Sequence, residues 1–292
     1  MTTLALKLVM HARENGYAVP ACNIHNTETA QALLLAAERA ESPVFLQVGR
    51  AVISHMGLLA AHEMTRRVAE ESEAIHVIHL DNGTKEEVLE ALTLGFRSVM
   101  YDGGHLPFEE RIRETTWLTA IAHDFGALVE AELGRVHGAG VASERASHHA
   151  YVKQAERFAA ETDVDVLGIS AGAVHGVSTL NPDPLAIGLI EKIRSVVPVP
   201  LVLHEVSGVP DEELRAAIGA GVHKLDADND LRREFRRGIE EAWGSGDRQL
   251  ETAMTRGREL MVEATVQKMQ VFGGSGRASE FLPLTTASAR HW

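Results

Sequence analysis

The stretch Ile75-His-Val-Ile-His-Leu-Asp-Asn-Gly83 decides how the chain folds, because a largely apolar run ends there in polar residues. An apolar run of this length is typical of a strand that is covered on both faces, as in a parallel sheet. In parallel α/β proteins, chemistry gathers where such strands end. The stretch therefore predicts a strand over Ile75–Leu80 that delivers Asp81 and Asn82 to a functional face.

Runs of the same kind recur along the chain and alternate with amphipathic helical patterns. The spacing between runs is that of a βαβ unit, and eight such units predict an α/β protein with a (β/α)₈ TIM barrel. The expected strands are Ala18–Asn23, Val44–Val48, Ile75–Leu80, Ser98–Tyr101, Leu128–Glu132, Val166–Ile169, Leu201–His204 and Lys224–Ala227. The helical patterns include Thr27–Ala40, Lys85–Leu94, Glu109–His123, Val152–Glu161, Pro184–Ser195 and Asp211–Ala220.

The alternation runs without a linker, so we interpret residues 1–292 as one barrel domain. Gly134–His149 is the longest stretch without clear periodicity, and we expect it to form a mobile loop over the active face. A helical pattern at about Gln249–Gln270 exceeds the eight units. It predicts an extra C-terminal helix and tail at about residues 246–292, used in packing or oligomerisation.

The composition excludes several classes of partner. The formal charge of −13 argues against nucleic acid or an anionic membrane as the main partner. The N-terminus has no signal-peptide pattern, and no apolar run reaches membrane-spanning length, so we expect a cytoplasmic protein. The single cysteine, Cys22, excludes an internal disulfide and a cysteine-based zinc site.

Polar residues stand at or just beyond the ends of most expected strands. Packing alone does not explain so many of them at neighbouring ends, and they predict an active site on this face. The candidates are Asn23, His25, Asp81, Asn82, Asp102, Glu130, Glu132, His175, Gly176, His204, Glu205, Ser207, Asp226, Asp228 and Asn229.

The local sequence leaves the role of each candidate open. His175 and His204 suit a divalent metal such as zinc, or they are two hydrogen-bonded histidines in a polar cleft. Asp81 is either a general acid/base or the N-cap of the next helix. Glu130 and Glu132 face the same side of one strand. One of them is a ligand or base, or it pairs with a lysine or arginine inside the barrel.

These residues lie in motifs that resemble the class II, zinc-dependent ketose-bisphosphate aldolases of the fructose- and tagatose-bisphosphate type. The resemblance implies the same barrel, a zinc ion that polarises a ketose carbonyl, and a homodimer or homotetramer. It covers nearly the whole chain and is carried by Gly16-Tyr-Ala-Val-Pro-Ala-Cys-Asn-Ile-His-Asn26, His79-Leu-Asp-Asn-Gly83, Met100-Tyr-Asp-Gly-Gly-His-Leu-Pro-Phe-Glu-Glu110, Val129-Glu-Ala-Glu-Leu-Gly134, His175-Gly176, Pro200-Leu-Val-Leu-His204 and Lys224-Leu-Asp-Ala-Asp-Asn-Asp230.

The resemblance also implies roles for individual residues. Asp81 matches the acid/base that handles the proton of the aldol hydroxyl, and His175 and His204 match two of the three zinc-binding histidines. Asp102 and Glu132 match carboxylates that can hold the metal in an alternative position. The substrate side of the site is expected to comprise Asn23, Gly176, Ser207, Asp226, Asp228 and Asn229, of which Ser207, Asp228 and Asn229 lie in phosphate-binding segments.

Three departures from the family pattern change this expectation. Asn82 stands where the motif H-L-D-H-G has its metal histidine, so the expected ligand set is Asn82, His175 and His204. Glu205 replaces a glycine, and Asp226 replaces an asparagine, which adds negative charge near the expected phosphate site. We therefore expect a diverged aldolase-like lyase that acts on a ketose or related carbonyl compound other than a standard bisphosphate.

Two other functions stay open at this point. One is a metal-independent enzyme of a different reaction on the same barrel, in which Asp81, Glu132 and Glu205 carry out acid/base chemistry without an ion. The other is a non-catalytic paralogue that binds a sugar-like molecule or supports a partner subunit. The retention of many polar strand ends favours an enzyme.

Overall fold

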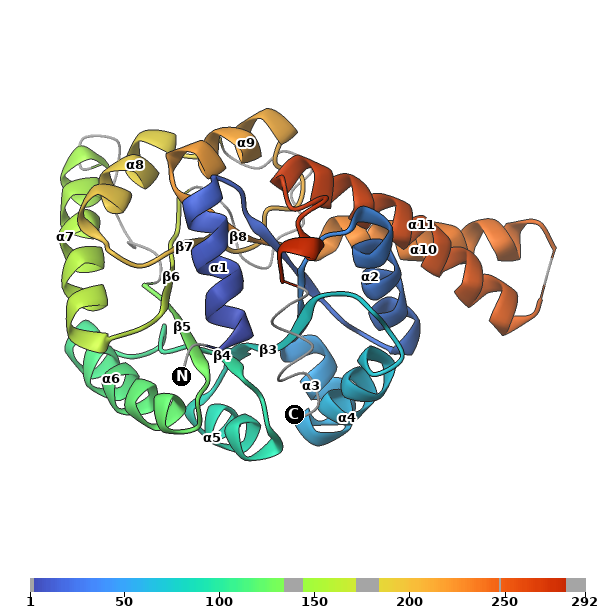
Figure 1. Cartoon of the computed structure of the whole chain (residues 1–292), viewed down its shortest axis with the longest axis horizontal. Coiled ribbons are helices and arrows are strands. Elements are labelled where there is room, and N and C mark those ends of the chain that lie inside the picture. Colours follow the sequence, from blue (N-terminus) through green and yellow to red (C-terminus); the bar gives the residue numbers. More distant parts are fainter. Residues whose placement is uncertain (1–2, 134–143, 172–183, 247, 282–292) are drawn as a thin grey trace.

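The computed structural model describes residues 3–133, 144–171, 184–246 and 248–281. Eight strands form a closed barrel in sequence order, and every neighbouring pair is parallel (Figure 1). The expected (β/α)₈ barrel is confirmed. The strands are β1 (Val19–Asn23), β2 (Val44–Val48), β3 (His76–Gly83), β4 (Ser98–Tyr101), β5 (Leu128–Glu132), β6 (Val166–Gly168), β7 (Leu201–Leu203) and β8 (Val222–Ala227).

Helices surround the barrel (Figure 1). In the described part of the chain, none of them is long and apolar enough to cross a membrane. They are α1 (Leu4–Asn15), α2 (Thr27–Ala40), α3 (Arg50–Met56), α4 (Leu58–Ala69), α5 (Lys85–Leu94), α6 (Phe108–Asp124), α7 (Glu144–Thr162), α8 (Ile187–Val196), α9 (Asp211–Ala220), α10 (Asn229–Gly244) and α11 (Leu250–Phe272), followed by the 3₁₀ turn η2 (Ala278–Phe281).

Strand β3 is longer than its apolar run predicts, because the polar residues at its end continue the strand to Gly83. Its pairing with β4 shifts register between Leu80 and Gly83, and Asn82 within this step has φ +53°. A left-handed residue at a register shift is typical of a β-bulge, which re-aims the neighbouring side chains. The strand itself therefore positions Asp81.

Helix α7 corrects one expectation. It begins at Glu144, so the loop expected over Gly134–His149 is wrong for residues 144–149, while residues 134–143 lie outside the described part. Residues 144–149 read Glu-Arg-Ala-Ser-His-His, so the helix begins without the apolar stripe that makes a helix recognisable in sequence. Farther along it, Tyr151, Ala155, Phe158, Ala159 and Thr162 are buried.

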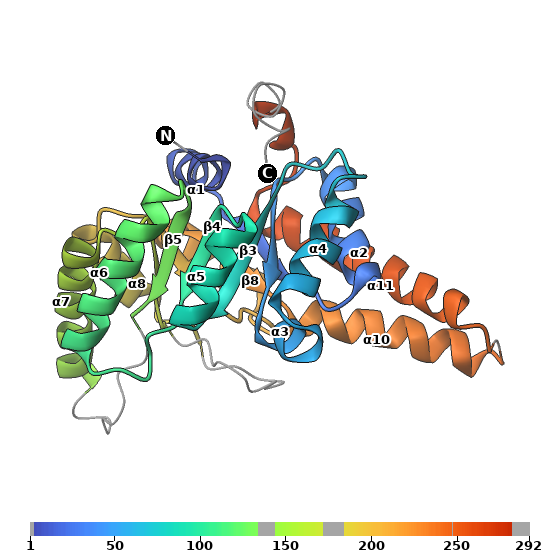
Figure 2. The same ribbon diagram turned by 90° about the horizontal axis from the view of Figure 1, so that it is seen from below.

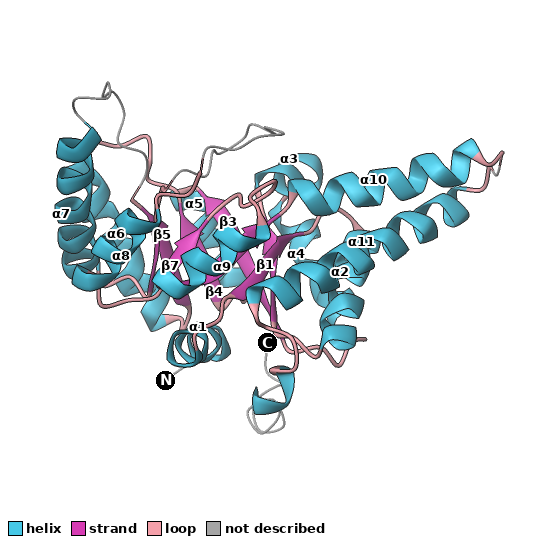
Figure 3. Cartoon of the chain, turned by 90° about the horizontal axis from the view of Figure 1, so that it is seen from above, coloured by secondary structure: helices cyan, strands magenta, loops and turns pink. Residues whose placement is uncertain are grey.

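Helix α1 covers the amino end of the barrel, as Figures 2 and 3 show. Its Leu8 and Val9 are fully buried and belong to one apolar cluster with Phe45, Leu128 and Val202 from the strands. Full burial of such side chains contributes about 1.5–3 kcal/mol each. The carboxyl ends of the strands are thus the ends at which polar groups gather.

Helices α10 and α11 form a hairpin that projects from the barrel (Figures 2 and 3). The helix expected at Gln249–Gln270 is confirmed as α11, and α10 is the helix of the eighth βα unit, for which the residue patterns specify no range. The two helices cross at glycines. A Cβ built on Gly238 would lie 2.5 Å from Arg256 O, and one built on Gly257 would lie 2.8 Å from Phe235 O. The hairpin therefore packs backbone against backbone.

This close crossing predicts that Gly238→Ala destabilises the protein by about 1–3 kcal/mol, because the added methyl group forces the two helices apart. The matched control is Gly219→Ala in α9, where an added Cβ meets nothing within 4 Å. The control should leave stability unchanged or raise it by about 0.5–1 kcal/mol, since alanine favours a helix. Urea unfolding measures both changes, and equal stability of the two variants would contradict the crossing.

Candidate active site

Five charged side chains meet inside the barrel toward its carboxyl end. Asp81 comes from β3, Glu130 from β5, His204 from the residue after β7, and Lys224 and Asp226 from β8. All five are buried, with at most 6% of the residue surface exposed. A buried charge is tolerated only where it is paired, so the contacts among these groups determine whether the cluster can exist.

The pairs form a continuous network around the His204 ring. Glu130 contacts Lys224 Nζ with Oε2 and His204 Nε2 with Oε1, each at 2.8 Å. His204 Nδ1 lies 2.6 Å from Asp226 Oδ2, and Lys224 Nζ lies 3.4 Å from Asp226 Oδ1. Gln47 on β2 donates its Nε2 hydrogen to Asp226 Oδ2 at 3.0 Å. The imidazole of His204 is thus held between two carboxylates.

Each charged group in this network stabilises the charged form of its neighbours. Burial lowers the pKa of His204, but the Asp226 and Glu130 carboxylates outweigh it and raise this pKa well above its usual value. Burial raises the pKa of Glu130, yet Lys224 and His204 bring it down to about 2. The same two cations hold the pKa of Asp226 below its usual range against burial. The network is therefore ionised at neutral pH.

Asp81 is in a different electrostatic environment. Asn23 Nδ2 donates to its Oδ2 at 3.2 Å, and Asn82 Nδ2 donates to its Oδ1 at 2.9 Å. Burial, followed by the nearby Asp226 carboxylate, raises the pKa of Asp81 to about 6. A carboxyl group with a pKa near the working pH can both take up and release a proton, which suits a general acid/base.

The cluster also offers ligands for a metal ion. Asp81, His204 and Asp226 each present one ligand atom, and these atoms all lie within 4.8 Å of one another. Asp226 Oδ1 is buried without a hydrogen bond, although the Lys224 ammonium lies 3.4 Å away. One imidazole and two carboxylates suit a divalent ion such as zinc or a harder divalent metal. The residues present therefore fit a divalent metal.

The expected ligand set Asn82, His175 and His204 overlaps with this one only at His204. Asn82 lies beside the cluster and turns its amide nitrogen toward Asp81. His175 lies outside the described residues, as does the expected substrate residue Gly176. The sequence predicted Asp226 as a substrate residue, whereas the geometry places its carboxylate against His204.

Two glycines leave room for the site. A Cβ on Gly49, which follows β2, would lie 2.6 Å from Asn23 Nδ2 and 3.0 Å from an oxygen of Asp81. A Cβ on Gly168 of β6 would lie 3.1 Å from His204 Nε2 and 3.3 Å from the Glu132 side chain. Side chains at these positions would displace the groups that make up the cluster.

Glu132 and Glu130 lie on one strand two residues apart, which places both on the same side. The alternative that one of them pairs with a lysine inside the barrel holds for Glu130. Glu132 is half-buried at the end of β5, and its Oε1 accepts a hydrogen bond from Ser170 Oγ at 3.3 Å. Glu132 is therefore the more accessible of the two carboxylates.

Glu205 occupies an unusual backbone conformation directly after His204. Its φ is +54°, close to the +53° of Asn82 directly after Asp81. Left-handed conformations are uncommon outside glycine and gather at functional sites, where neighbouring structure enforces them. Glu205, which stands where the resemblance implies a glycine, thus has a conformation that glycine adopts readily.

Other candidates form pairs at the ends of β1 and β8. His25 Nε2 lies 2.8 Å from Asp228 Oδ1, and Arg232 lies 3.1 Å from Asp228 Oδ2. Asn229 Oδ1 accepts a hydrogen bond from the Arg232 guanidinium. The Asp102 side chain accepts a hydrogen bond from Gly104 N and has no contact with the cluster among the interactions described.

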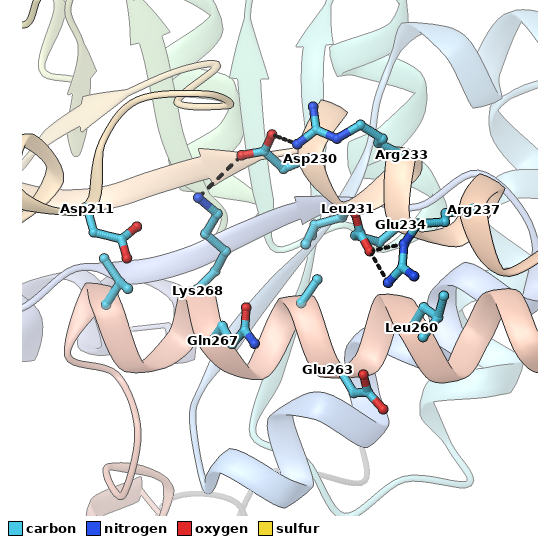
Figure 4. Close-up of a pocket in the computed structure, with 12 residues that line it drawn as sticks. Asp211, Asp230, Leu231, Arg233, Glu234, Arg237, Leu260, Glu263, Gln267 and Lys268 are labelled. Carbon is cyan, nitrogen blue, oxygen red and sulfur yellow. Dashed lines mark hydrogen bonds and ion pairs between the residues drawn. The ribbon is translucent and has the colours of Figure 1, made fainter. Parts of the chain in front are cut away.

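Ser207 and Gly208 are engaged by Asp230. Gly208 N donates to Asp230 Oδ2 at 3.1 Å, and Asp230 N donates to Ser207 Oγ at 3.3 Å. Lys268 and Arg233 pair with the same carboxylate, as Figure 4 shows. This carboxylate forms part of the wall of a cavity of about 410 Å³ where α10 and α11 join the barrel. The wall of the cavity contains no member of the Asp81 cluster.

Sequence reasoning missed two members of the network, Lys224 and Gln47. Gln47 is the one polar residue of Val44–Val48, and Lys224 is a charged residue in Val222–Ala227, all of whose residues are buried. A polar residue in a strand that is covered on both faces must find a buried partner, and this signal could have identified both.

Comparison with known proteins gives a consistent result. The family model described as "Fructose-bisphosphate aldolase class-II" matches residues 4–277. A fructose-bisphosphate aldolase of Streptococcus pyogenes serotype M1 is 35% identical over 94% of this chain and 98% of its own length. A sulfofructosephosphate aldolase of Alkalicoccus urumqiensis is 32% identical over 94% of this chain and 97% of its own length.

A similar fold is found among solved structures. The crystal structure of the YdjI aldolase from Escherichia coli K12 superposes with a TM-score of 0.82 at 27% sequence identity. The match covers 95% of this chain and all of the other. The overall fold is thus shared with an aldolase.

The geometry predicts that Asp226→Asn lowers the pKa of Asp81 from about 6 toward its ordinary value of 3.8, because the second carboxylate is removed. Carbon-13 NMR of the aspartate side chains in metal-free protein measures this shift. The matched control is Asp228→Asn, whose carboxylate pairs with His25 and Arg232 instead. An Asp81 pKa that is the same in both variants would refute the coupling.

Proposed function

The chain belongs to the class II fructose-bisphosphate aldolase family, and from this premise we propose that it makes or breaks a carbon–carbon bond of a ketose or related carbonyl compound other than a standard bisphosphate. The observation that carries the proposal is Asp81, buried at the carboxyl end of the barrel beside His204 and Asp226. Family membership makes it an aldehyde-lyase, so the proposal concerns the residues and the substrate.

Asp81 is the proposed proton carrier. In the cleavage direction its carboxylate accepts the proton of the hydroxyl on the carbon that becomes the aldehyde, as the adjacent carbon–carbon bond breaks. Asn23 and Asn82 each donate a hydrogen bond to it, so both oxygens are held in place. In the synthesis direction the same group returns the proton. We also propose Glu132 and Glu205 as catalytic residues: Glu132 matches a carboxylate of the family, whereas Glu205 departs from the family pattern and directly follows His204.

His204 and Asp226 are the proposed core of a divalent metal site. His175 joins them by the family match, and the Asp226 carboxylate offsets the loss of a histidine at Asn82. Zinc is the metal that the family resemblance implies. When bound, a divalent metal polarises the ketose carbonyl. The chain's own residues place the two ligands, orient the Asp81 carboxylate and keep the surrounding barrel dry.

The charge at the ends of β7 and β8 supports a substrate other than a bisphosphate. Lys224 on β8 pairs with Glu130 and Asp226, while Lys268 on α11 pairs with Asp230, which follows β8. A phosphate dianion would have to compete with these carboxylates for each cation. The relative from Alkalicoccus urumqiensis carries a name that includes a sulfonated sugar phosphate, so substrate variation within the family is consistent with this proposal.

The remaining binding residues and the assembly are part of the same proposal. The substrate is a small carbonyl or sugar-like molecule held by Asn23, Gly176, Ser207, Asp226, Asp228 and Asn229. We further propose that the chain acts as one domain, in a homodimer or homotetramer in the cytoplasm. Trp243 and Leu250, about half exposed at the outer end of the α10–α11 hairpin, are consistent with such an assembly.

The role of Asp81 predicts that Asp81→Asn lowers kcat by about 10²–10⁴-fold, because an amide cannot exchange the proton. The matched control is Asp163→Asn, an exposed aspartate just before β6 at the other end of the barrel. Its φ of +54° is one that asparagine tolerates. Steady-state retro-aldol assays give both values, and an unchanged kcat in Asp81→Asn would exclude it as the proton carrier.

A retro-aldol screen over free and phosphorylated ketoses tests the substrate, together with metal analysis of the purified protein. We expect a bound divalent metal, loss of activity on chelation with recovery on adding the ion back, and preference for a ketose with fewer phosphates. Fructose-bisphosphate cleavage at a rate usual for the family would remove the altered substrate from the proposal. Activity that survives chelators would favour the metal-independent enzyme instead.

A further inference from the structure

Three basic side chains come together at the amino end of the barrel, opposite the candidate active site. Arg13 lies in the last turn of α1, Arg194 lies in the last turn of α8, and His223 is the second residue of β8. Helix α1 contacts β8 and covers this end of the barrel (Figures 2 and 3). The three residues therefore join two helices and a strand that the candidate active site does not use for proton transfer.

The two guanidinium groups bind neighbouring carbonyl groups of the segment between α8 and β7. Arg13 Nη1 donates to Pro198 O, and Arg194 Nη1 donates to Val197 O at 3.2 Å. Because the Cα atoms of consecutive residues are only about 3.8 Å apart, these contacts bring two cations onto one short segment. Burial and then the charge of Arg13 lower the pKa of Arg194. Within the described part of the chain, neither arginine forms an ion pair with a carboxylate.

His223 places a buried polar group beside these cations. The residue is 4% exposed, and its Nδ1 atom is buried without a hydrogen-bond partner among the described residues. Burial, followed by the charges of Arg194 and Arg13, lowers the pKa of His223 to about 4. The ring is therefore neutral at neutral pH and can donate a hydrogen bond from one nitrogen. A buried polar atom without a partner costs free energy, so Nδ1 indicates a ligand.

Gly221 gives Arg194 the space that it needs to reach this position. A Cβ built on Gly221 would lie 2.6 Å from Arg194 Cγ and 2.7 Å from Arg194 Cδ. The aliphatic stem of the arginine thus packs against the backbone two residues before His223. Close packing of the stem fixes where the guanidinium lies, whereas a solvated surface arginine would need no such contact.

The positions at helix ends explain each arginine only by itself. A basic residue in the last turn of a helix interacts favourably with the helix dipole and with the last carbonyl groups. This role does not require two arginines to meet on consecutive carbonyls beside an unpartnered imidazole. An oxyanion accounts for all three features, because it balances the positive charge and accepts several hydrogen bonds at once.

We propose that Arg13, Arg194 and His223 form a binding site for a small oxyanion of the phosphate type at the amino end of the barrel. Each guanidinium has five N–H hydrogens and uses one nitrogen for its carbonyl contact, so donors remain for a ligand. The bound anion would connect α1, α8 and β8 and thereby stabilise the helix that covers the barrel. This site does not depend on the reaction proposed for the opposite end.

The test is isothermal titration calorimetry with inorganic phosphate, with sodium chloride used to keep the ionic strength constant. Wild-type protein is compared with Arg194→Gln, which removes one charge of the site, and with His223→Leu, which removes the imidazole at similar volume. The matched control is Arg215→Gln on α9, since Arg215 is exposed and forms no ion pair with a described residue. The control also removes one positive charge, so it measures the effect of net charge alone.

We expect Arg194→Gln and His223→Leu each to weaken phosphate binding about 10- to 100-fold, the usual effect of losing a hydrogen bond to a charged group. Arg215→Gln should bind phosphate as the wild type does. No saturable phosphate binding by the wild type would overturn the proposal. Phosphate that binds at the other end of the barrel would bind all four proteins equally, and this result would overturn it as well.

Thermal unfolding separates loss of the site from loss of the fold. Without phosphate, His223→Leu should unfold at the wild-type temperature or above it, because Nδ1 has no described partner to lose. Phosphate at ten times its Kd should raise the unfolding midpoint of the wild type by about 2–4 °C. The same addition should not shift His223→Leu, and an equal shift in both proteins would contradict the site.

Discussion

A carboxylate without access to water stays ionised only where cations meet it, and the fully buried Glu130 imposes this requirement on three strands at once. Its partners are Lys224 on β8 and His204 after β7. Removing one partner from such a buried set typically costs about 3–5 kcal/mol, since an uncompensated charge remains. These contacts therefore fix β5, β7 and β8 relative to one another. The geometry of the site follows from that arrangement.

Barrel closure brings these distant residues together. Lys224 and Glu130 are 94 positions apart in the chain, and Gln47 and Asp226 are 179 apart. Both pairs form because β8 returns to β1 and completes the ring of parallel strands. Helix α1 covers the amino end with apolar side chains, so the polar residues concentrate at the carboxyl end. The fold thus determines where chemistry takes place before any particular reaction is considered.

The sequence predicts the barrel well because each strand is a short apolar run that alternates with a helical pattern. It gives no residue range for α1, α3, α4 and α10, of which α4 and α10 are implied only as the helices of the second and eighth βα units. At the site, Asp81 and His204 could be found because they end strands. The contact of Asp226 with His204 depends on barrel register, which residue patterns alone do not specify. His175 and Gly176 stay predictions.

The Asp226 carboxylate affects both the proposed metal site and the expected phosphate site. When His204 is neutral, the carboxylates of Asp81, Glu130 and Asp226 and the ammonium of Lys224 leave two negative charges, which a divalent ion would balance. An asparagine at position 226 would leave only one. The same carboxylate that improves the balance for a cation repels a phosphate dianion nearby. The proposed metal binding and the proposed weaker affinity for a second phosphate therefore share one physical cause, the charge of a single side chain.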